Sequence, residues 1–278
     1  MTLPVPPRRR GEELIDDPAI DPAVVVRSLG DVARSNALFG GRRAVLAALA
    51  PALGPAGSAL TLLDVGTGMG DIPLHARRLA ARRGVRLHAV GVELNFALAR
   101  ASRAATDASV CGDAFALPFP DRSIDVVTAS QVLHHFTGTD VARLLAELDR
   151  VARRRVIVGD LRRSYAAAAG FWVASRALGF HPVTRHDGVL SVFRGFTADE
   201  LAGHVRAAVP DARDLIVRHR LGWRVVASWR PDDRRAAAPG TAGAQETDGP
   251  AREPATPGTP RLTVAAPAAP PARASALI

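Results

Sequence analysis

The chain has 278 residues, 47% of them hydrophobic, which suffices for the buried core of one ordinary globular domain with additional segments. Its formal net charge is +9, but lysine is absent, the arginines are spread along the chain, and aromatic residues make up only 5%. This distribution lacks the basic patch beside aromatic residues that is typical of nucleic-acid binding, so we expect no nucleic-acid partner.

The cysteine content and the N-terminus bear on the cellular compartment. A single cysteine, Cys111, excludes an internal disulfide and a multi-cysteine metal site, and its apolar neighbours predict a small buried side chain. No apolar segment follows the first arginines, so the N-terminus is not a secretory signal. Proline and glycine interrupt the uncharged stretch 44–63, which argues against a membrane span. We expect a cytoplasmic protein without a membrane span.

The apolar pattern along the chain predicts helices first and then strands alternating with helices. Helical spacing runs through residues 12–50 and is broken by NALFGG at 36–41. From residue 60 onward, short apolar runs alternate with helical patterns, which indicates parallel strands in a doubly wound α/β sheet. Strands are expected at 60–65, 87–92, 108–112, 124–129, 155–160, 213–219 and 223–229, and helices near 71–83, 95–105, 140–152 and 198–208.

The last part of the chain differs from this pattern. The final two strands are joined by little more than a turn, so one edge of the sheet should be antiparallel. Thr197 and Glu200 predict a capping box before the last helix. Residues 231–278 are rich in Pro, Ala, Gly and Thr and are expected to be a disordered tail. The expected division is a helical cap at 1–54, a catalytic domain at 55–230 and the tail.

A glycine-rich turn, LLDVGTGMGDIP at 62–73, follows the first expected strand. At this place in an open parallel sheet, the backbone usually forms the floor of a ligand site. A dinucleotide loop needs a third glycine at the position of Asp71, where an anion would face a phosphate, so that class of cofactor is disfavoured. A cofactor with positive charge and no phosphate, S-adenosylmethionine, fits Asp64 and the bare backbone of Gly66, Gly68 and Gly70 better.

Acids also follow the next two expected strands. Glu93 comes after LHAVGV and is placed to accept hydrogen bonds from both ribose hydroxyls. Asp113 comes after ASVCG and can accept from the adenine amino group, while the amide of Ala114 donates to the ring. Three acids at successive strand ends are a stronger signal than the glycines alone.

Together, the runs LLDVGTGMGD, GVEL, GDAFALPFPDRSIDVVTASQVLHHF and VARRRVIVGDL resemble the class I S-adenosylmethionine-dependent methyltransferases. Within that class, the small-molecule branch near the ubiquinone and menaquinone biosynthesis enzymes is the most similar. The resemblance covers about residues 55–230 and implies a Rossmann-like, seven-stranded sheet with an antiparallel last strand. It also implies that Ser130 and Gln131 lie beside the methionine portion of the cofactor.

Two histidine-containing segments are candidates for the acceptor site. His135 in QVLHHF and His186 in HPVTRHDG are the predicted catalytic bases, since one histidine suffices for an acidic hydroxyl. Arg185 and Trp172 are predicted to bind the acceptor. Residues 12–42 and 164–194 should form a lid over a largely apolar molecule. Quinone-pathway O-methyltransferases bind a metal through acids at the positions of Gln131 and His134, so no metal is expected here.

The main hypothesis is therefore methyl transfer to oxygen or carbon of a small hydroxylated metabolite that is phenolic, quinone-like or a polyketide. Two alternatives stay open: a protein of the same fold that binds the cofactor without catalysis, and an RNA methyltransferase. The segment TASQVLHH lacks the Asn/Asp-Pro-Pro-aromatic signature of enzymes that methylate nucleic-acid amino groups. The oligomeric state is not determined by these patterns.

Overall fold

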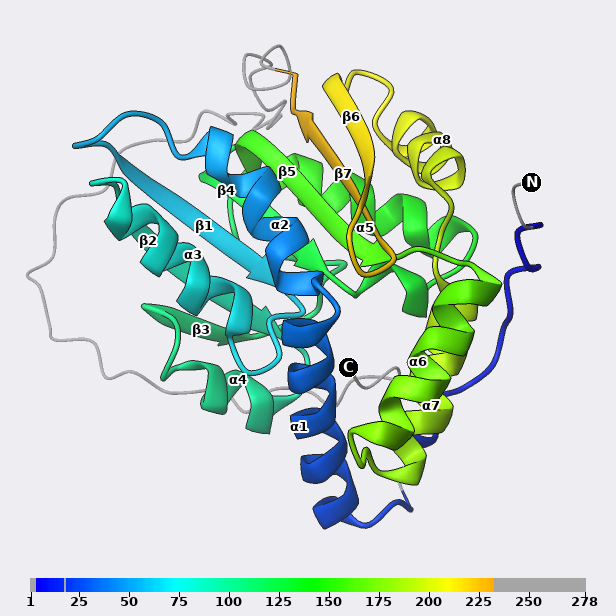
Figure 1. Cartoon of the computed structure of the whole chain (residues 1–278). Helices are drawn as coiled ribbons and strands as arrows, with labels where there is room; N and C mark the ends of the chain where they lie inside the picture. Colours follow the sequence, from blue (N-terminus) through cyan, green and yellow to red (C-terminus); the bar gives the residue numbers. More distant parts are fainter. Residues whose placement is uncertain (1–3, 18, 233–278) are drawn as a thin grey trace, which may run out of the picture.

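Strands and helices alternate along the chain as predicted (Figure 1). The computed structural model describes residues 4–17 and 19–232. Its strands are β1 (Ala59–Val65), β2 (Arg86–Glu93), β3 (Ala108–Cys111), β4 (Ile124–Ser130), β5 (Ala152–Leu161), β6 (Arg213–Arg220) and β7 (Arg224–Arg230). Its α-helices are α1 (Pro22–Leu38), α2 (Gly41–Leu49), α3 (Asp71–Arg82), α4 (Phe96–Ser102), α5 (Thr139–Val151), α6 (Tyr165–Ala177), α7 (Pro182–Arg194) and α8 (Ala198–Ala208). Short 3-10 turns are η1 (Leu14–Asp16), η2 (Ala50–Ala52) and η3 (Leu133–His135).

The strands form one sheet in the order β3-β2-β1-β4-β5-β7-β6. The first five strands are parallel, and β7 is antiparallel to both β5 and β6. This arrangement confirms the predicted doubly wound sheet with an antiparallel edge. The order reverses beside β1, which places the carboxyl ends of β1 and β4 at the point where open α/β sheets bind ligands.

Neighbouring residues of each central strand point to opposite faces of the sheet. On one face Leu62, Val126 and Ile157 pack against α2 and α3. On the other face, Leu63 and Val127 pack against α5 and α8. Both faces are apolar, which explains the nearly continuous hydrophobic runs of β1 and β4. The capping box of Thr197 and Glu200 is present at the start of α8, as predicted.

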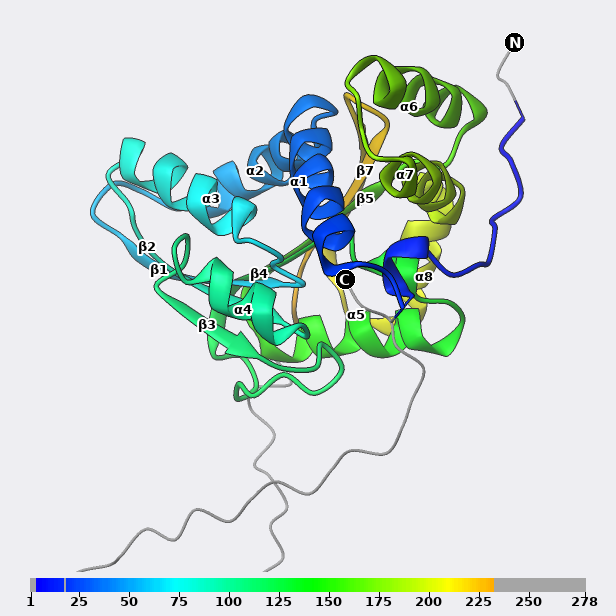
Figure 2. The same cartoon turned by 90° about the horizontal axis from the view of Figure 1, so that it is seen from below.

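Three helices extend beyond the sheet at the edge where β1, β4 and β5 end (Figure 1). Helices α6 and α7 form an antiparallel pair, and α7 contacts α1, η1 and η3. Seen from below, α1 lies opposite this pair, and the N-terminal segment runs along α7 (Figure 2). The predicted lid segments, 12–42 and 164–194, thus lie at the ligand-binding edge of the sheet.

Two further predictions concern the surface of the protein. Cys111 was expected to be buried, but it is exposed, because β3 is the edge strand and its last residues have a neighbour on one side only. None of the described helices is both long and apolar enough to cross a membrane. Residues 233–278 of the predicted tail lie outside the described residues.

We expect Gly159→Ala to destabilise the protein, because α2 packs directly on β5 at this residue. A Cβ atom there would lie 2.7 Å from Cγ2 of Val45, which is shorter than a van der Waals contact. Overpacking of this kind costs about 1–3 kcal/mol. Urea unfolding should show this loss, and Val45→Ala in the same chain should restore part of it.

The matched control is Gly203→Ala in α8, where a Cβ would meet nothing within 4 Å. That change should leave stability unchanged or raise it by up to about 1 kcal/mol, because alanine is the better helix former. Equal unfolding free energies for Gly159→Ala and the unsubstituted protein would contradict the proposed contact.

Candidate functional site

The turn after β1 is built from three glycines that all have positive φ angles, +67° at Gly66, +53° at Gly68 and +80° at Gly70. Packing requires glycine at two of these positions. A Cβ on Gly66 would lie 2.5 Å from Val132, and a Cβ on Gly70 would lie 2.7 Å from Ala105. A Cβ on Gly68 would meet no atom within 4 Å. Gly68 therefore presents bare backbone to open space, where a ligand can approach.

Asp64 lies beneath this turn and is almost completely buried. Its two carboxylate oxygens accept hydrogen bonds from the hydroxyls of Thr67 (2.9 Å) and Thr128 (2.7 Å). Burial raises the pKa of Asp64 to about 7, because the charged form is poorly solvated there. A positively charged ligand above the turn would stabilise the ionised form.

Glu93 connects the glycine turn to the end of β2. One carboxylate oxygen accepts from the amide of Gly68 (2.9 Å) and the other from the amide of Asn95 (3.1 Å). Each oxygen keeps a second lone pair for a ligand hydroxyl. Asp113, beyond β3, is exposed and accepts from the amide of Phe115 (2.9 Å). The predicted acids therefore follow β1, β2 and β3 in space as they do in sequence.

Gln131 follows Ser130 at the end of β4 and has a φ of +58°, which is unusual for a residue with a side chain. Its amide donates to the carbonyl of Gly159 (2.7 Å), and its side-chain amide donates to Asn36 of α1. This hydrogen bond joins the predicted lid helix to the cofactor side of the sheet. Backbone strain at such a position is typical of functional sites.

These residues fit S-adenosylmethionine better than a dinucleotide. The N-terminus of α3, which would hold a pyrophosphate, already carries Asp71, whose carboxylate pairs with Arg42 (3.0 Å). The open backbone at Gly68 and the buried carboxylate of Asp64 suit an aminoacid portion with positive charge. The residues that would hold the cofactor are Asp64, Gly66, Gly68, Gly70, Glu93, Asp113, Ala114, Ser130 and Gln131.

A cavity of about 510 Å³ adjoins this region. Its walls are largely apolar side chains from α1, α6 and α7, including Val25, Leu29, Phe171 and Val192. Asn95 and Gln131 line it on the cofactor side. We call five of its other polar lining residues the polar end of the cavity: Glu13, Asn36, His134, His135 and Arg224.

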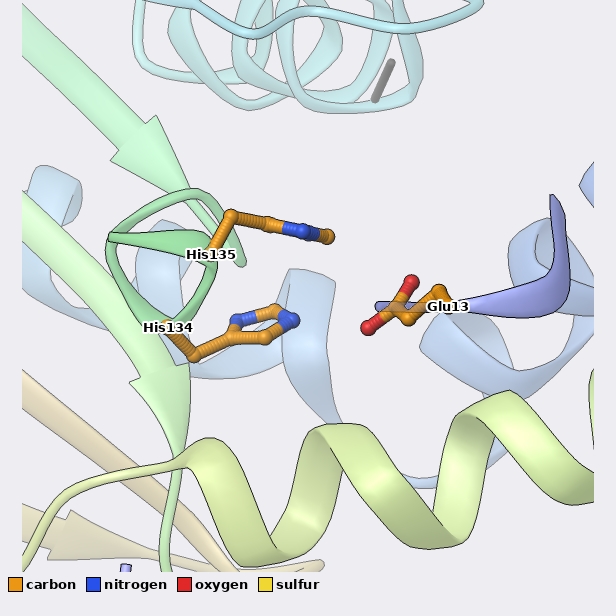
Figure 3. Close-up of side chains that lie close together, drawn as sticks. All are labelled: Glu13, His134 and His135. Atoms are coloured by element: carbon orange, nitrogen blue, oxygen red, sulfur yellow. The ribbon is translucent and has the colours of Figure 1, made fainter. Parts of the chain in front are cut away.

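His134 and Asp160 form a fully buried pair at the polar end. Nδ1 of His134 lies 2.7 Å from Oδ1 of Asp160, and the amide of His134 donates to Oδ2 (3.0 Å). A carboxylate only accepts hydrogen bonds, so Nδ1 carries the hydrogen of this bond and Nε2 is the ring nitrogen that faces away from Asp160. Figure 3 shows the outer ring nitrogen of His134 pointing toward Glu13, away from β4.

Glu13, His134 and His135 form a cluster whose candidate ligand atoms all lie within 4.8 Å of one another (Figure 3). One carboxylate and two imidazoles is a set that can bind a transition metal. However, Arg194 already pairs with Glu13 (3.2 Å) and donates to the backbone carbonyls of His134 and His135. Burial and the neighbouring charges keep the pKa of His135 well below its ordinary value, so this imidazole is neutral.

The structure separates the other predicted acceptor residues from this cavity. His186 is 55% exposed, and its Nδ1 lies 2.9 Å from Asp187. Trp172 is half exposed and stacks with Arg176. Neither they nor Arg185 are among the residues that line the cavity. Phe171, Trp223 and Asp187 line it instead.

Sequence reasoning missed four residues of the polar end or its support: Glu13, Asn36, Asp160 and Arg224. Asp160 ends the fifth strand in VIVGDL, so its position at the ligand-binding edge was a usable signal. Arg224 starts the last strand, and an antiparallel strand begins at the edge where its parallel neighbours end. Glu13 had no such signal, because its place depends on the path of the N-terminal segment.

Comparisons with known proteins place part of the chain among methyltransferases. Residues 63–158 match the family described as "Methyltransferase domain". Two curated demethylmenaquinone methyltransferases, from Roseiflexus sp. (strain RS-1) and Roseiflexus castenholzii, are each 35% identical over 136 residues, which is 43% of this chain and 55% of the relative. The chain thus spans about half the length of the curated relatives it matches.

Among solved structures, a S-adenosylmethionine-dependent methyltransferase from Thermotoga maritima, a possible histamine N-methyltransferase, is similar in fold with a TM-score of 0.50. It is 16% identical, and the likeness covers 76% of this chain and 99% of that one. The family match over residues 63–158 supports the predicted resemblance to methyltransferases. The match ends at Val158, before α6 and α7, and therefore does not identify the methyl acceptor.

We expect S-adenosylmethionine to bind more tightly as the pH rises from 5.5 to 7.5, by about tenfold. The pKa of Asp64 is about 7 without ligand, and the positively charged cofactor favours the ionised carboxylate. Below pH 7, binding of the cofactor must therefore release a proton from Asp64, and this release weakens the binding. Calorimetry across this range should show the trend, and Asp64→Asn should flatten it. An equally steep profile in Asp64→Asn would contradict this role for Asp64.

Proposed function

We propose that this protein transfers the methyl group of S-adenosylmethionine to an oxygen or carbon of a small, largely apolar, hydroxylated molecule. Phenolic, quinone-like and polyketide compounds belong to this class. The observation that carries the proposal is the cavity: its walls are apolar, its polar end holds a buried histidine–carboxylate pair, and it reaches the cofactor side at Asn95 and Gln131.

The residues around the glycine turn would hold the cofactor. Gly68 leaves room for its aminoacid portion, Asp64 balances its positive charge, and Glu93 accepts from its ribose hydroxyls. Asp113 and Ala114 would contact the adenine, and Ser130 and Gln131 the methionine portion. When bound, the cofactor would supply an electrophilic methyl group. Correct alignment of an acceptor with such a group is worth about 7–11 kcal/mol of the barrier.

His134 is the base that the geometry favours for the acceptor proton. The proton leaves the acceptor hydroxyl for Nε2 of His134, and the oxygen keeps the bonding electron pair. Asp160 holds the imidazole in the required tautomer and stabilises the positive charge that forms on it. His135, the base predicted from the sequence, lies beside His134, with ring centroids 4.2 Å apart. Roles for His186, Arg185 and Trp172 stay predictions.

The N-terminal segment would shield this chemistry from water. Leu14 and Ile15 donate backbone hydrogen bonds to Asp187 of α7 (2.8 and 3.0 Å), which places Glu13 at the cavity. Arg194 and Ser191 donate to Glu13. A sequestered site strengthens electrostatic interactions and protects an ionised acceptor from reprotonation.

The curated relatives add support for the acceptor class. They are named for demethylmenaquinone, a quinone-type acceptor. A quinol of this kind combines an apolar body with a ring hydroxyl, which is the combination that the cavity suits.

We expect His134→Ala to lower turnover by about 10²–10⁴-fold, the usual contribution of a general base, while S-adenosylmethionine binding stays unchanged. Formation of S-adenosylhomocysteine should be measured with demethylmenaquinols and alkylated phenols as acceptors. His135→Ala and His186→Ala are the comparison variants. A larger loss of turnover in either comparison variant would identify that histidine as the base. Full turnover in all three variants would exclude a histidine base.

We also expect the reaction to run without a metal, because Arg194 already supplies the positive charge opposite Glu13. Dialysis against EDTA should leave turnover within about twofold. Added Zn²⁺, Mn²⁺ or Fe²⁺ should not raise it. A tenfold stimulation by one of these ions that is lost in Glu13→Gln would show that the cluster in Figure 3 is a metal site.

A further inference from the structure

Arg224 is a buried cation for which the described residues provide no hydrogen-bond partner. It begins β7 opposite Leu161 of β5, is 4% exposed, and lines the cavity. Within the described part of the chain, its guanidinium makes no hydrogen bond or ion pair, and its Nε is fully enclosed. An arginine presents five N–H donors, so this side chain has several hydrogen-bond donors without an acceptor among the described residues.

No group in residues 4–17 or 19–232 supplies the missing acceptor. Asp160 is the negative group whose charge acts on Arg224, but its oxygens already accept from His134 and from the amide of Leu161 (2.7 Å). Burial lowers the pKa of Arg224 to about 10, so the guanidinium remains charged at neutral pH. A buried charge destabilises the protein unless a partner compensates it.

The surroundings of Arg224 point to a ligand. Arg224 and Gln131 both face Gly41. A Cβ on Gly41 would lie 3.4 Å from Nε of Arg224 and 3.3 Å from the side-chain nitrogen of Gln131. The guanidinium thus reaches toward the end of β4. Two other buried polar atoms without a partner, Oγ of Ser28 and Nδ1 of His135, belong to residues that line the same cavity.

We propose that Arg224 binds an anionic oxygen of the acceptor, either a carboxylate or an ionised hydroxyl. This inference rests on the proposed function and narrows its substrate to an amphiphile. The anionic end lies at Arg224, and the apolar body lies along α1 and α7. Guanidinium groups bind such oxygens by paired, charge-assisted hydrogen bonds.

The position in the sheet favours the acceptor over the carboxylate of the cofactor. Strand β7 is separated from β1, which carries the glycine turn, by β4 and β5. At about 4.8 Å per strand, the two backbones are roughly 14 Å apart. Arg224 is therefore on the acceptor side of the methyl position, although its long side chain bends back toward Gln131.

A matched pair of probes tests the charge preference without the natural acceptor. Decanoate and 1-decanol have the same apolar chain and differ in the anionic group. We expect the protein without cofactor to bind decanoate at least tenfold more tightly than 1-decanol, measured by calorimetry or by the fluorescence of Trp223. Arg224→Met should abolish this preference, and Arg224→Lys should keep part of it. Arg43→Met, at an exposed position of α2, is the control and should keep all of it.

A second arm distinguishes the two possible sources of the anion. S-adenosylmethionine carries a carboxylate, and 5′-methylthioadenosine lacks it. We expect Arg224→Met to change the affinity for both by less than threefold. Selective loss of S-adenosylmethionine binding would assign Arg224 to the cofactor and overturn the proposal, as would equal binding of decanoate and 1-decanol to the unsubstituted protein.

A third arm distinguishes ligand binding from a structural role. If Arg224 lacks a partner in the free protein, Arg224→Met should leave the melting temperature unchanged or raise it. A large fall would show that Arg224 stabilises the fold and would contradict the proposal. These measurements do not need methyl transfer, so a failure of the proposed function, seen as no S-adenosylhomocysteine formation, is separable from a failure of this inference.

Discussion

The site depends on one buried carboxylate, Asp160, at the end of β5. Its side chain is fully buried, and it accepts hydrogen bonds from the amide and ring of His134 and from the amide of Leu161. These bonds hold the η3 turn against the neighbouring strand and fix the tautomer of His134. The same charge is the only compensation that Arg224 receives among the described residues. Removal of Asp160 would therefore disturb the base and leave Arg224 fully uncompensated.

Arginine side chains connect the remaining parts of the site. Arg194 of α7 binds the histidine turn and Glu13, and Arg163 binds the carbonyl of Pro6 (2.8 Å). Arg8 donates to the carbonyl of Arg194 (2.7 Å) and stacks over Phe196. These contacts attach the N-terminal segment to α7 and to the end of β5. The cavity is thus formed by segments far apart in sequence, held by charged hydrogen bonds to backbone carbonyls.

Most of the fold could be predicted from the sequence because its signals are local. The strands agree with the predicted ranges to within a few residues, and the antiparallel edge follows from the short turn between β6 and β7. The glycine turn and the acids after β1, β2 and β3 could also be located, because the carboxyl ends of parallel strands share one edge. The burial of Cys111 was predicted wrongly, because an apolar run does not show whether its strand is at the edge.

The acceptor side was harder to predict, and the reason is physical. Trp172 and Phe171 are neighbours in sequence, but only Phe171 lines the cavity, because the rotation of α6 against α7 decides which face is covered. The pairing of His134 with Asp160, and the arrival of Glu13 and Arg224 at the same point, join residues up to about two hundred positions apart. The sequence by itself determined the sheet and the glycine turn, and from them the proposed methyl donor, since these follow from local pattern. Only the tertiary structure decided which polar groups meet at the polar end of the cavity and which of them lack a partner among the described residues, since burial and hydrogen bonding between distant segments have no local signature.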